Sequence, residues 1–325
     1  MIIISTSPCR LSLFGGGTDI NPYCDLYSGL TINMAINLRQ KLTVYFDKDI
    51  INFNNGKGGP NIFPTLANPN FYYTILKEFG LDDMHQIKFK SECDGIIESG
   101  LGSSAAAAVS LLGVINKKLN LKLSLDQIAH KAWELEVKKI GLFGGKQDQY
   151  IAAFGGVNIM EFKDGKVDIT PLAKGFIEPL FPYLCLFYTG ENRQSALIQE
   201  EFRNLTQKQI EALDEIKKLA VEAIDPITQG DFKQVGYLLN KAWEFKKASN
   251  KGVTNKRIDE IYSKALKAGA LGGKIMGAGG GGFILFICPI WAQVVLKERL
   301  REMGCEWWDF SPCFQGLDVR ILPDE

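Results

Sequence analysis

Three glycine-rich stretches constrain the fold of this 325-residue chain more than any other feature. They are SPCRLSLFGGGTD at residues 7–19, ESGLGSSAAA at residues 98–107 and IMGAGGGGF at residues 275–283. Glycine adds no side chain to a core and loses more backbone freedom on folding than any other residue. We therefore expect turns and loops in which a ligand approaches bare main chain.

The composition favours a globular protein and excludes several kinds of partner. Hydrophobic residues make up 46% of the chain and charged residues 23%, and the formal net charge is zero without a long block of one sign. Phosphate-backbone binding depends on clustered Lys and Arg, so no nucleic-acid partner is expected. The seven cysteines form no CxxC pair and only two histidines occur, which predicts free thiols and no His/Cys metal site.

The expected location is the cytoplasm. The opening residues, MIIISTSPCR, carry no basic region of the kind that begins a signal peptide, and the longest apolar run, FILFICPIW, is too short to span a membrane. Free, scattered cysteines fit a reducing compartment. The sequence leaves both a monomer and a homodimer open.

The order of the elements predicts an α+β fold with two domains, residues 1–175 and 176–325. Strands are expected at the N-terminus, in a tightly joined pair at 29–38 and 41–47, and in a hairpin turning at Asp164-Gly165. Helices begin near Ser103 and at Ser124, which forms a capping box with Gln127. The second half holds a buried strand, helical stretches at about 194–224, 231–248 and 255–268 with a break at Asp225-Pro226, and then strand, glycine loop, strand, helix and two short strands.

The first glycine stretch is a candidate binding turn. Arg10 offers a fixed cation suited to phosphate oxygens, and the carboxylate of Asp19 accepts hydrogen bonds from ligand hydroxyls. Gly16, Gly17 and Thr18 lie between them. A tight turn with a surface salt bridge explains the same residues about equally well.

The second glycine stretch leads into a helix. Glycines there leave main-chain N–H groups free, and the helix dipole adds positive potential, so the site suits an anion. Ser103 and Ser104 are placed to cap the helix or to touch phosphate or a metal ion. No GK[ST] follows, so this is not a Walker A loop. Its G-x-G-x-x-A pattern leaves an NAD-linked oxidoreductase open, although the acidic residue of that fingerprint is missing, and an ordinary capped helix is a further alternative.

The third glycine stretch lies between two predicted strands, as a flap that lines a ligand would, with Lys274 and Met276 at its edge; a flexible hairpin loop is the alternative. Two acidic residues accompany the glycines. Asp148 lies in the first turn of a short helix, where the dipole stabilises a carboxylate. Glu136 lies late in a helix and opposes the dipole, which a bound cation would explain, although a solvated glutamate is the simpler interpretation.

In this order the three stretches resemble the motifs of the GHMP kinase superfamily, named after galacto-, homoserine, mevalonate and phosphomevalonate kinases, and the resemblance covers essentially the whole chain. GLGSSAAA is similar to the ATP-phosphate loop of the family and KIMGAGGGG to its third motif. GGGTD and GGKQDQ are most similar to the D-glycero-D-manno-heptose 7-phosphate kinases, close to the fucokinase branch. In fucokinases an aromatic residue is expected where Lys146 stands.

The resemblance implies an N-terminal domain like domain 2 of ribosomal protein S5, a ferredoxin-like C-terminal domain and an active site between them. Asp148 would accept the proton of the sugar hydroxyl, Arg10 would stabilise the transferring phosphate, and Mg²⁺ would be held by Ser104 (or Ser103) and Glu136. The residues implied to bind ATP are Glu98, Gly100, Leu101, Gly102, Ser103, Ser104 and Ala105. The residues implied to bind the sugar are Gly16, Gly17, Thr18, Asp19, Lys146, Gln147, Arg193, Gly277, Ala278, Gly279 and Gly280.

The implied reaction is ATP-dependent phosphorylation of the anomeric hydroxyl of a heptose 7-phosphate to the 1,7-bisphosphate, for activated heptose in surface polysaccharide synthesis. The phosphate already on this sugar needs cationic partners, and Lys146 and Arg193 are candidates. A fucokinase-like enzyme for an unphosphorylated sugar stays open. So does a catalytically silent sugar-binding regulator, although the presence of Asp148, Arg10 and Glu136 argues against it.

Overall fold

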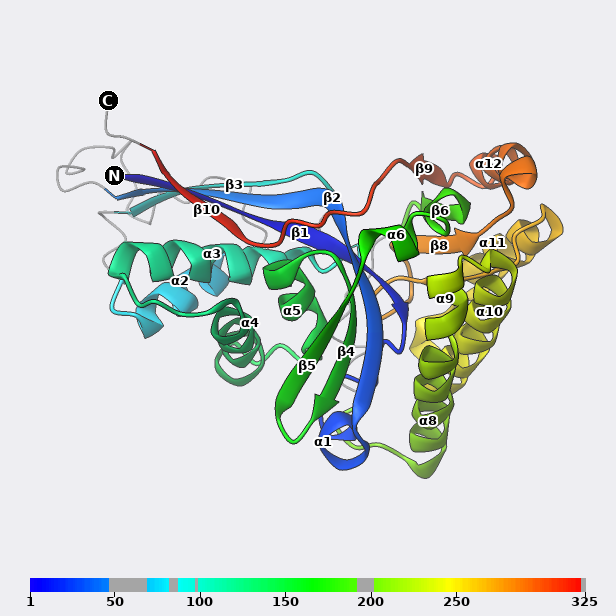
Figure 1. Cartoon of the computed structure of the whole chain (residues 1–325), viewed down its shortest axis with the longest axis horizontal. Coiled ribbons are helices and arrows are strands. Elements are labelled where there is room, and N and C mark those ends of the chain that lie inside the picture. The colour runs from blue at the N-terminus through cyan, green and yellow to red at the C-terminus, as the bar shows by residue number, and fades with distance from the viewer. Residues whose placement is uncertain (47–68, 82–86, 97–98, 192–201, 323–325) are drawn as a thin grey trace.

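The computed structural model describes residues 1–46, 69–81, 87–96, 99–191 and 202–322, which form two antiparallel sheets with their helices (Figure 1). The larger sheet has the order β10-β1-β2-β4-β5, and β3 also pairs with β2. Its strands are β1 (Ile2–Phe14), β2 (Gly29–Phe46), β3 (Ile87–Cys93), β4 (Val157–Lys163), β5 (Lys166–Leu172) and β10 (Asp318–Leu322).

Strand β2 is one continuous strand, so the predicted pair at 29–38 and 41–47 is wrong. Arg39 and Gln40 remain paired with β1 in the middle of this strand. The Arg39 guanidinium donates to the carbonyl of Thr6, and Gln40 Nε2 donates to Ser91 Oγ at 2.6 Å. Because neighbouring strands satisfy these polar side chains, the chain needs no turn here.

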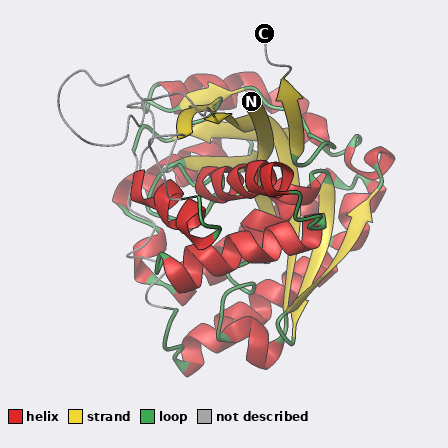
Figure 2. Ribbon diagram, turned by 90° about the vertical axis from the view of Figure 1, so that its left-hand side faces the viewer, coloured by secondary structure: helices red, strands yellow, loops and turns green. Residues whose placement is uncertain are grey.

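Helices cover one face of the larger sheet, as Figures 1 and 2 show. They are α2 (Pro69–Glu78), α3 (Ser103–Leu119), α4 (Leu125–Glu134) with a π-helical turn at Leu135–Lys139, and α5 (Gln147–Phe154), while the short α1 (Tyr23–Tyr27) follows β1. Residues 105–115 of α3, which begin with four alanines, are buried, which lets this helix pack closely on β1 and β2. The capping box of Ser124 with Gln127 and the hairpin turn at Asp164-Gly165 are confirmed.

The smaller sheet has the order β7-β8-β6-β9. Its strands are β6 (Leu184–Tyr188), β7 (Gly272–Ile275), β8 (Phe283–Ile287) and β9 (Glu306–Trp308). The helices of this half are α6 (Lys174–Ile177), α8 (Gln207–Glu222), α9 (Ile224–Gln229), α10 (Phe232–Ser249), α11 (Lys256–Lys267) and α12 (Gln293–Arg301), with short 3₁₀ turns at Phe181–Tyr183, Lys251–Val253 and Ile290–Ala292. An apolar core that joins β1 and β2 to β6, β8 and α10 binds the two halves together.

The α+β architecture is confirmed, with two local departures. The break expected at Asp225-Pro226 falls at Ala223, between α8 and α9, and Asp225-Pro226 itself lies in the first turn of α9, where proline is tolerated because that N–H has no helical acceptor. The last strand, β10, runs antiparallel to β1 in the first sheet. The C-terminal residues therefore return to the half of the molecule that holds the N-terminus, across the boundary expected near residue 175.

Candidate active site

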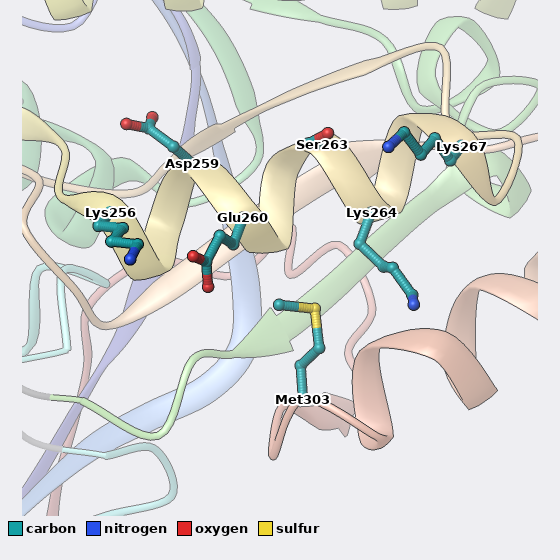
Figure 3. A pocket seen from close by; sticks show the side chains of 7 residues that line it. All are labelled: Lys256, Asp259, Glu260, Ser263, Lys264, Lys267 and Met303. Carbon is teal, nitrogen blue, oxygen red and sulfur yellow. The ribbon is translucent and has the colours of Figure 1, made fainter.

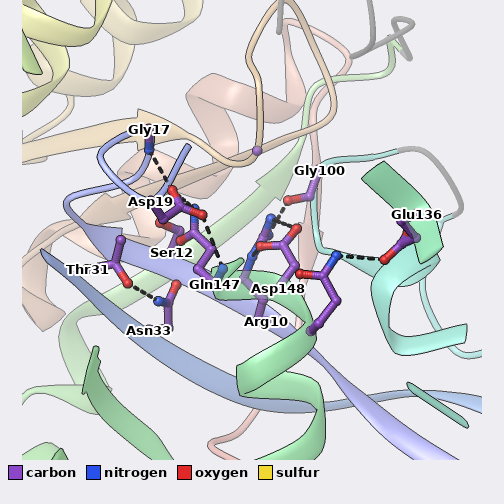
Figure 4. Close-up of polar contacts among 12 residues, drawn as sticks. Arg10, Ser12, Gly17, Asp19, Thr31, Asn33, Gly100, Glu136, Gln147 and Asp148 are labelled. Carbon is purple, nitrogen blue, oxygen red and sulfur yellow. Dashed lines mark hydrogen bonds and ion pairs between the residues drawn. The ribbon is translucent and has the colours of Figure 1, made fainter. Parts of the chain in front are cut away.

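The centre of the candidate site is an ion pair between β1 and α5. Arg10 Nε and Nη2 donate to the two carboxylate oxygens of Asp148 at 2.7 and 2.6 Å, and Nη1 donates to the carbonyl of Gly100 (Figure 4). Arg10 is buried, whereas the Asp148 side chain is 26% exposed. One guanidinium thus fixes the carboxylate and ties it to the second glycine stretch, and Asp148 keeps a face for a ligand.

The second glycine stretch forms an open helix N-terminus beside this pair. Gly102 is the N-cap of α3 with φ 75°, no side chain caps the helix, and the first helical donor is Ala106, to Gly102 O at 3.0 Å. The N–H groups of Ser103–Ala105 therefore have no acceptor within the helix. Ser103 and Ser104 are helical residues and not caps, which corrects that expectation. A Cβ on Gly102 would lie 3.3 Å from Asp148 Oδ2, so the open amides and the carboxylate are adjacent.

Glu136 lies on the other side of Asp148, in the π-helical turn after α4. It is buried and accepts a hydrogen bond from Gln149 Nε2 at 2.6 Å, and it interacts with the hydroxyl of Ser104. Burial raises the pKa of Glu136 to about 7, and the charge of Asp148 adds to that rise. The other amide atom of Gln149, Oε1, is buried without a partner. The side chains of Ser104 and Glu136, the two residues expected to bind the metal ion, thus lie together. Gln149 Oε1, which has no hydrogen-bond donor, belongs to the side chain that contacts Glu136.

Asp19 has a different environment from the one expected. Asp19 is fully buried. Its Oδ1 atom accepts hydrogen bonds from Gly17 N at 3.1 Å and from Gln147 Nε2 at 2.9 Å. Its Oδ2 atom accepts from Gln147 N at 3.1 Å. Burial raises its pKa, and Asp148 adds to the effect. A Cβ on Gly145 would lie 1.8 Å from Oδ2, which explains the glycine there. Asp19 therefore joins the first glycine turn to the start of α5, and its oxygens already have protein donors.

The third glycine stretch packs mostly against the protein's own main chain. Gly280 N donates to Val253 O at 2.8 Å, and Gly282 N donates to Glu191 O at 2.7 Å. A Cβ on Gly279 would lie 2.6 Å from Val253 O. Gly279 and Gly280 are buried, whereas Gly277 and Ala278 are half-buried at the edge that faces Gly100. Main chain of the protein itself thus packs around the second half of this loop.

Two lysines complete the surroundings. Lys274 Nζ donates to Ser12 O at 2.7 Å, and Lys246 Nζ donates to the carbonyls of Gly277 at 2.6 Å and Ile275 at 3.2 Å. Lys274 was expected at the edge of the loop, and Met276 beside it is buried as well. Lys246 was missed, because α10 carries several lysines and nothing local distinguishes this one.

The remaining predicted residues fall into two groups. Lys146 is buried, with Nζ 4.7 Å from the centroid of the Trp133 ring, and Gly16, Gly17 and Thr18 form the turn above Asp19. Leu101 is buried beneath the helix entry, where its carbonyl accepts from Arg10 N at 2.9 Å. Glu98 and Arg193 lie outside the described residues, so their predicted contacts stay predictions.

A surface depression along α11 lies apart from these groups. Figure 3 shows its lining side chains, which come from α11 and from Met303. Along this exposed helix face one lysine precedes two acids and two lysines follow them, and these side chains do not converge on one point, so the depression carries no catalytic arrangement. In the described part of the chain, no helix is long and apolar enough to cross a bilayer.

Open amides at a helix N-terminus, next to a fixed carboxylate–guanidinium pair, define a site suited to phosphoryl transfer. Comparison with known proteins gives the family. The model of the GHMP kinases N terminal domain matches residues 70–156 and that of the GHMP kinases C terminal region matches residues 192–302. These two matches cover more than half of the chain, which belongs to the GHMP kinases.

Individual relatives agree with this assignment. The chain is 33% identical over 97% of its length, and 98% of the other protein, to "D-glycero-alpha-D-manno-heptose 7-phosphate kinase" of Campylobacter jejuni. It is 27% identical over 93% of its length to "L-fucokinase/L-fucose-1-P guanylyltransferase" of Bacteroides fragilis, of which it spans 36%. A solved "D-glycero-D-manno-heptose 1-phosphate kinase" from Bacteroides thetaiotaomicron superposes with a TM-score of 0.77 at 26% identity, covering 99% of this chain and 100% of that one. The chain is thus a GHMP-type phosphotransferase, similar to sugar kinases along its whole length, and the predicted family and fold are confirmed.

Proposed function

We propose that the protein transfers the γ-phosphoryl group of ATP to the anomeric hydroxyl of a D-glycero-D-manno-heptose 7-phosphate and so forms the 1,7-bisphosphate. The observation that carries the proposal is the carboxylate of Asp148, held by Arg10 next to the open N-terminus of α3. Full-length similarity to a protein named as a heptose 7-phosphate kinase supports the choice of sugar. The product would serve the synthesis of activated heptose for surface polysaccharides.

Asp148 acts as the base in this proposal. Its exposed face accepts the proton of the sugar hydroxyl while the hydroxyl oxygen forms a bond to the γ-phosphorus and the bond to the leaving ADP breaks. The helix entry Ser103–Ala105 donates main-chain N–H groups to the phosphates, and the α3 dipole favours their negative charge. Arg10 keeps Asp148 oriented, and its charge lies beside the phosphates.

Glu136 and Ser104 fit a magnesium ion that accompanies ATP. Mg²⁺ usually takes one or two carboxylates and completes its shell with phosphate oxygens and water. Burial raises the pKa of Glu136, and its carboxylate interacts with the Ser104 hydroxyl. Gln149 donates to Glu136 through Nε2, and its Oε1 atom has no hydrogen-bond partner. When bound there, the ion would neutralise negative charge on the nucleotide phosphates. No group of three His, Cys, Asp or Glu that could hold a metal ion occurs among the described residues.

A kinase for an unphosphorylated sugar is the second candidate, and the similarity to the fucokinase of Bacteroides fragilis supports it. Release of ADP from Mg·ATP, measured across heptose 7-phosphate, free heptose, fucose, galactose and mevalonate, tests both. We expect robust turnover on heptose 7-phosphate. Turnover on free fucose and none on the phosphorylated heptose would replace the proposal by the second candidate. A nicotinamide absorbance change without ADP would contradict both.

A further inference from the structure

Two lysines, the buried Lys274 and the half-buried Lys246, lie near the first glycine turn. Lys274 is only 5% exposed, and both Lys274 and Lys246 donate to main-chain carbonyls. Neither forms an ion pair in the described part of the chain. Arg10 adds a third positive charge nearby, and Asp148 already pairs with it. Asp19 is the acid whose charge acts on both lysines.

Polar atoms without partners gather at the same place. The Ser12 hydroxyl and Gln147 Oε1 are buried without a hydrogen-bond partner. A Cβ on Gly16 would lie 2.8 Å from Ser12 Oγ, 3.6 Å from Lys274 Nζ and 3.8 Å from Gln147 Nε2. Three donor groups from β1, β7 and α5 thus surround the first glycine turn, and a side chain at Gly16 would occupy the space between them. Figure 4 shows Ser12, Gln147 and Asp19 grouped on one side of Arg10.

The electrostatics of the lysines favour an anion here. Burial lowers the pKa of Lys246 to about 7, with Arg10 adding to the effect. Burial lowers the pKa of Lys274 well below its ordinary value, and Lys246 and Arg10 lower it further. A bound dianion would raise the pKa of both lysines, because an opposite charge within a few ångströms favours the protonated ammonium.

We propose that Lys274, Lys246, Ser12 and the main chain at Gly16 form the subsite for the phosphate group that the sugar already carries. This inference rests on the proposed function and names the residues that select a phosphorylated acceptor. It replaces Lys146, whose ammonium lies over the Trp133 ring, as the principal candidate.

The spacing of residues along β1 indicates that the subsite binds the phosphate already on the sugar and not the phosphate transferred from ATP. Ser12 follows Arg10 by two residues on the same strand, so the Cα atoms of Ser12 and Arg10 are about 7 Å apart at the strand rise per residue. A sugar that presents its anomeric hydroxyl to Asp148 has its far end at such a separation. The ATP phosphates are assigned to the entry of α3, where Gly100 and Gly102 contact Arg10, and Gly277, which accepts from Lys246, packs against Gly100.

The test compares heptose 7-phosphate with free heptose in Lys274→Met and Lys246→Met enzymes. Charge-assisted hydrogen bonds contribute about 1.5–3 kcal/mol, so kcat/KM for the phosphorylated sugar should fall about 10- to 100-fold. The value for free heptose and the KM for ATP should change little. Lys247→Met is the matched control, since Lys247 lies beside Lys246 on α10 but pairs with Glu244 at the surface.

A binding measurement separates failure of this inference from failure of the proposed function. Inorganic phosphate is titrated calorimetrically into enzyme saturated with a non-hydrolysable ATP analogue, at pH 8 in two buffers of different ionisation enthalpy. We expect binding with proton uptake, weakened at least tenfold in Lys274→Met and unchanged in Lys247→Met. Equal phosphate affinity in wild type and Lys274→Met overturns the subsite whatever the sugar is. Loss of kcat and ATP affinity with intact phosphate binding would assign the lysines to the transferred phosphate and also overturn it.

Turnover of the wild type decides the proposed function independently. If heptose 7-phosphate is not phosphorylated but phosphate still binds through Lys274, the subsite stands and the acceptor is a different sugar phosphate. Circular dichroism and thermal unfolding of each variant show whether it is folded. If Lys274→Met does not fold, Lys246→Met carries the test, because its side chain is only half-buried.

Discussion

The two glycine-rich loops that meet in the middle of this kinase use their main chain in opposite ways. At the entry to α3, the N–H groups of Ser103–Ala105 have no helical acceptor. In the loop between β7 and β8, Gly280 and Gly282 donate to the carbonyls of Val253 and Glu191. The first loop is open to a ligand, and most of the second is closed by the protein.

The contrast shows that a run of glycines alone does not identify a ligand site. Two main chains in close contact leave as little room for a Cβ as a bound phosphate does. Gly100 and Gly277 illustrate this, because a Cβ on Gly277 would lie 2.8 Å from the Cα of Gly100. The two loops differ in whether their N–H groups have acceptors within the protein, and only the structure shows this difference.

The largest effect is expected at the open loop, from Asp148→Asn. Asn is a far weaker base and accepts with one oxygen, so kcat should fall by roughly 10²- to 10⁴-fold while ATP still binds. Steady-state ADP release and ATP titration measure the two quantities. Asp225→Asn is the matched control, since Asp225 also lies in the first turn of a helix but is exposed on α9. Turnover of Asp148→Asn at the wild-type rate would remove this residue from the mechanism.

At the closed loop the expected effect is on stability. A Cβ on Gly282 would lie 2.2 Å from the carbonyl oxygen of Ser99, at a φ of 83°. Left-handed strain of about 1–2 kcal/mol, plus overpacking of about 1–3 kcal/mol, should lower the free energy of unfolding of Gly282→Ala by about 3 kcal/mol.

Gly80→Ala is the control for this prediction, because Gly80 has a similar φ of 67° with nothing within 4 Å of its Cβ position. It should lose only the left-handed strain, about 1–2 kcal/mol. Denaturant unfolding measures both variants. Equal losses would mean that the β7–β8 loop relaxes away from Ser99 and is not closed.

The sequence identified the parts of the site that depend on local pattern. The glycine entry to α3, the capping box at Ser124 and the position of Asp148 in the first turn of α5 follow from residues a few positions apart. Interactions between distant segments were not visible there. The continuity of β2 through Arg39 depends on Thr6, and the placement of Lys246 depends on Gly277, a residue 31 positions away.

Asp19 shows the same limit within a predicted site residue. Its type and position suggested a contact with sugar hydroxyls, but Gln147, 128 residues later, supplies the donors and buries it. A carboxylate next to glycines has the same local pattern whether a ligand or a helix N-terminus satisfies it. Burial and hydrogen-bond partners, which are tertiary properties, decide between these possibilities.

A smaller effect that sharpens the comparison is expected from Gly102→Ala. The new Cβ would lie 3.3 Å from Asp148 Oδ2 and 3.4 Å from Arg10 Cγ, and φ is 75°. The neighbours are side chains and not main chain, so stability should fall by about 1–2 kcal/mol, as for Gly80→Ala. Displacement of the ion pair beside the open amides should raise the KM for ATP about tenfold, which is about 1.4 kcal/mol. An unchanged KM for ATP would show that the helix entry does not hold the nucleotide.

The last prediction concerns the first glycine turn. The Gly17 amide donates to Asp19, so this turn resembles the β7–β8 loop, whose N–H groups have acceptors within the protein. Burial raises the pKa of Asp19 in the folded protein, whereas in the unfolded chain it titrates near its ordinary value. Between these two pKa values the folded state binds more protons, so this residue makes the free energy of unfolding fall as pH rises. In urea unfolding from pH 4 to 7, the slope of the free energy of unfolding against pH should be more negative for the wild type than for Asp19→Asn, whatever constant offset the amide introduces. Identical slopes would mean that Asp19 is ionised with its ordinary pKa, as expected if water or a ligand reaches it, and the first turn would then belong with the open loop.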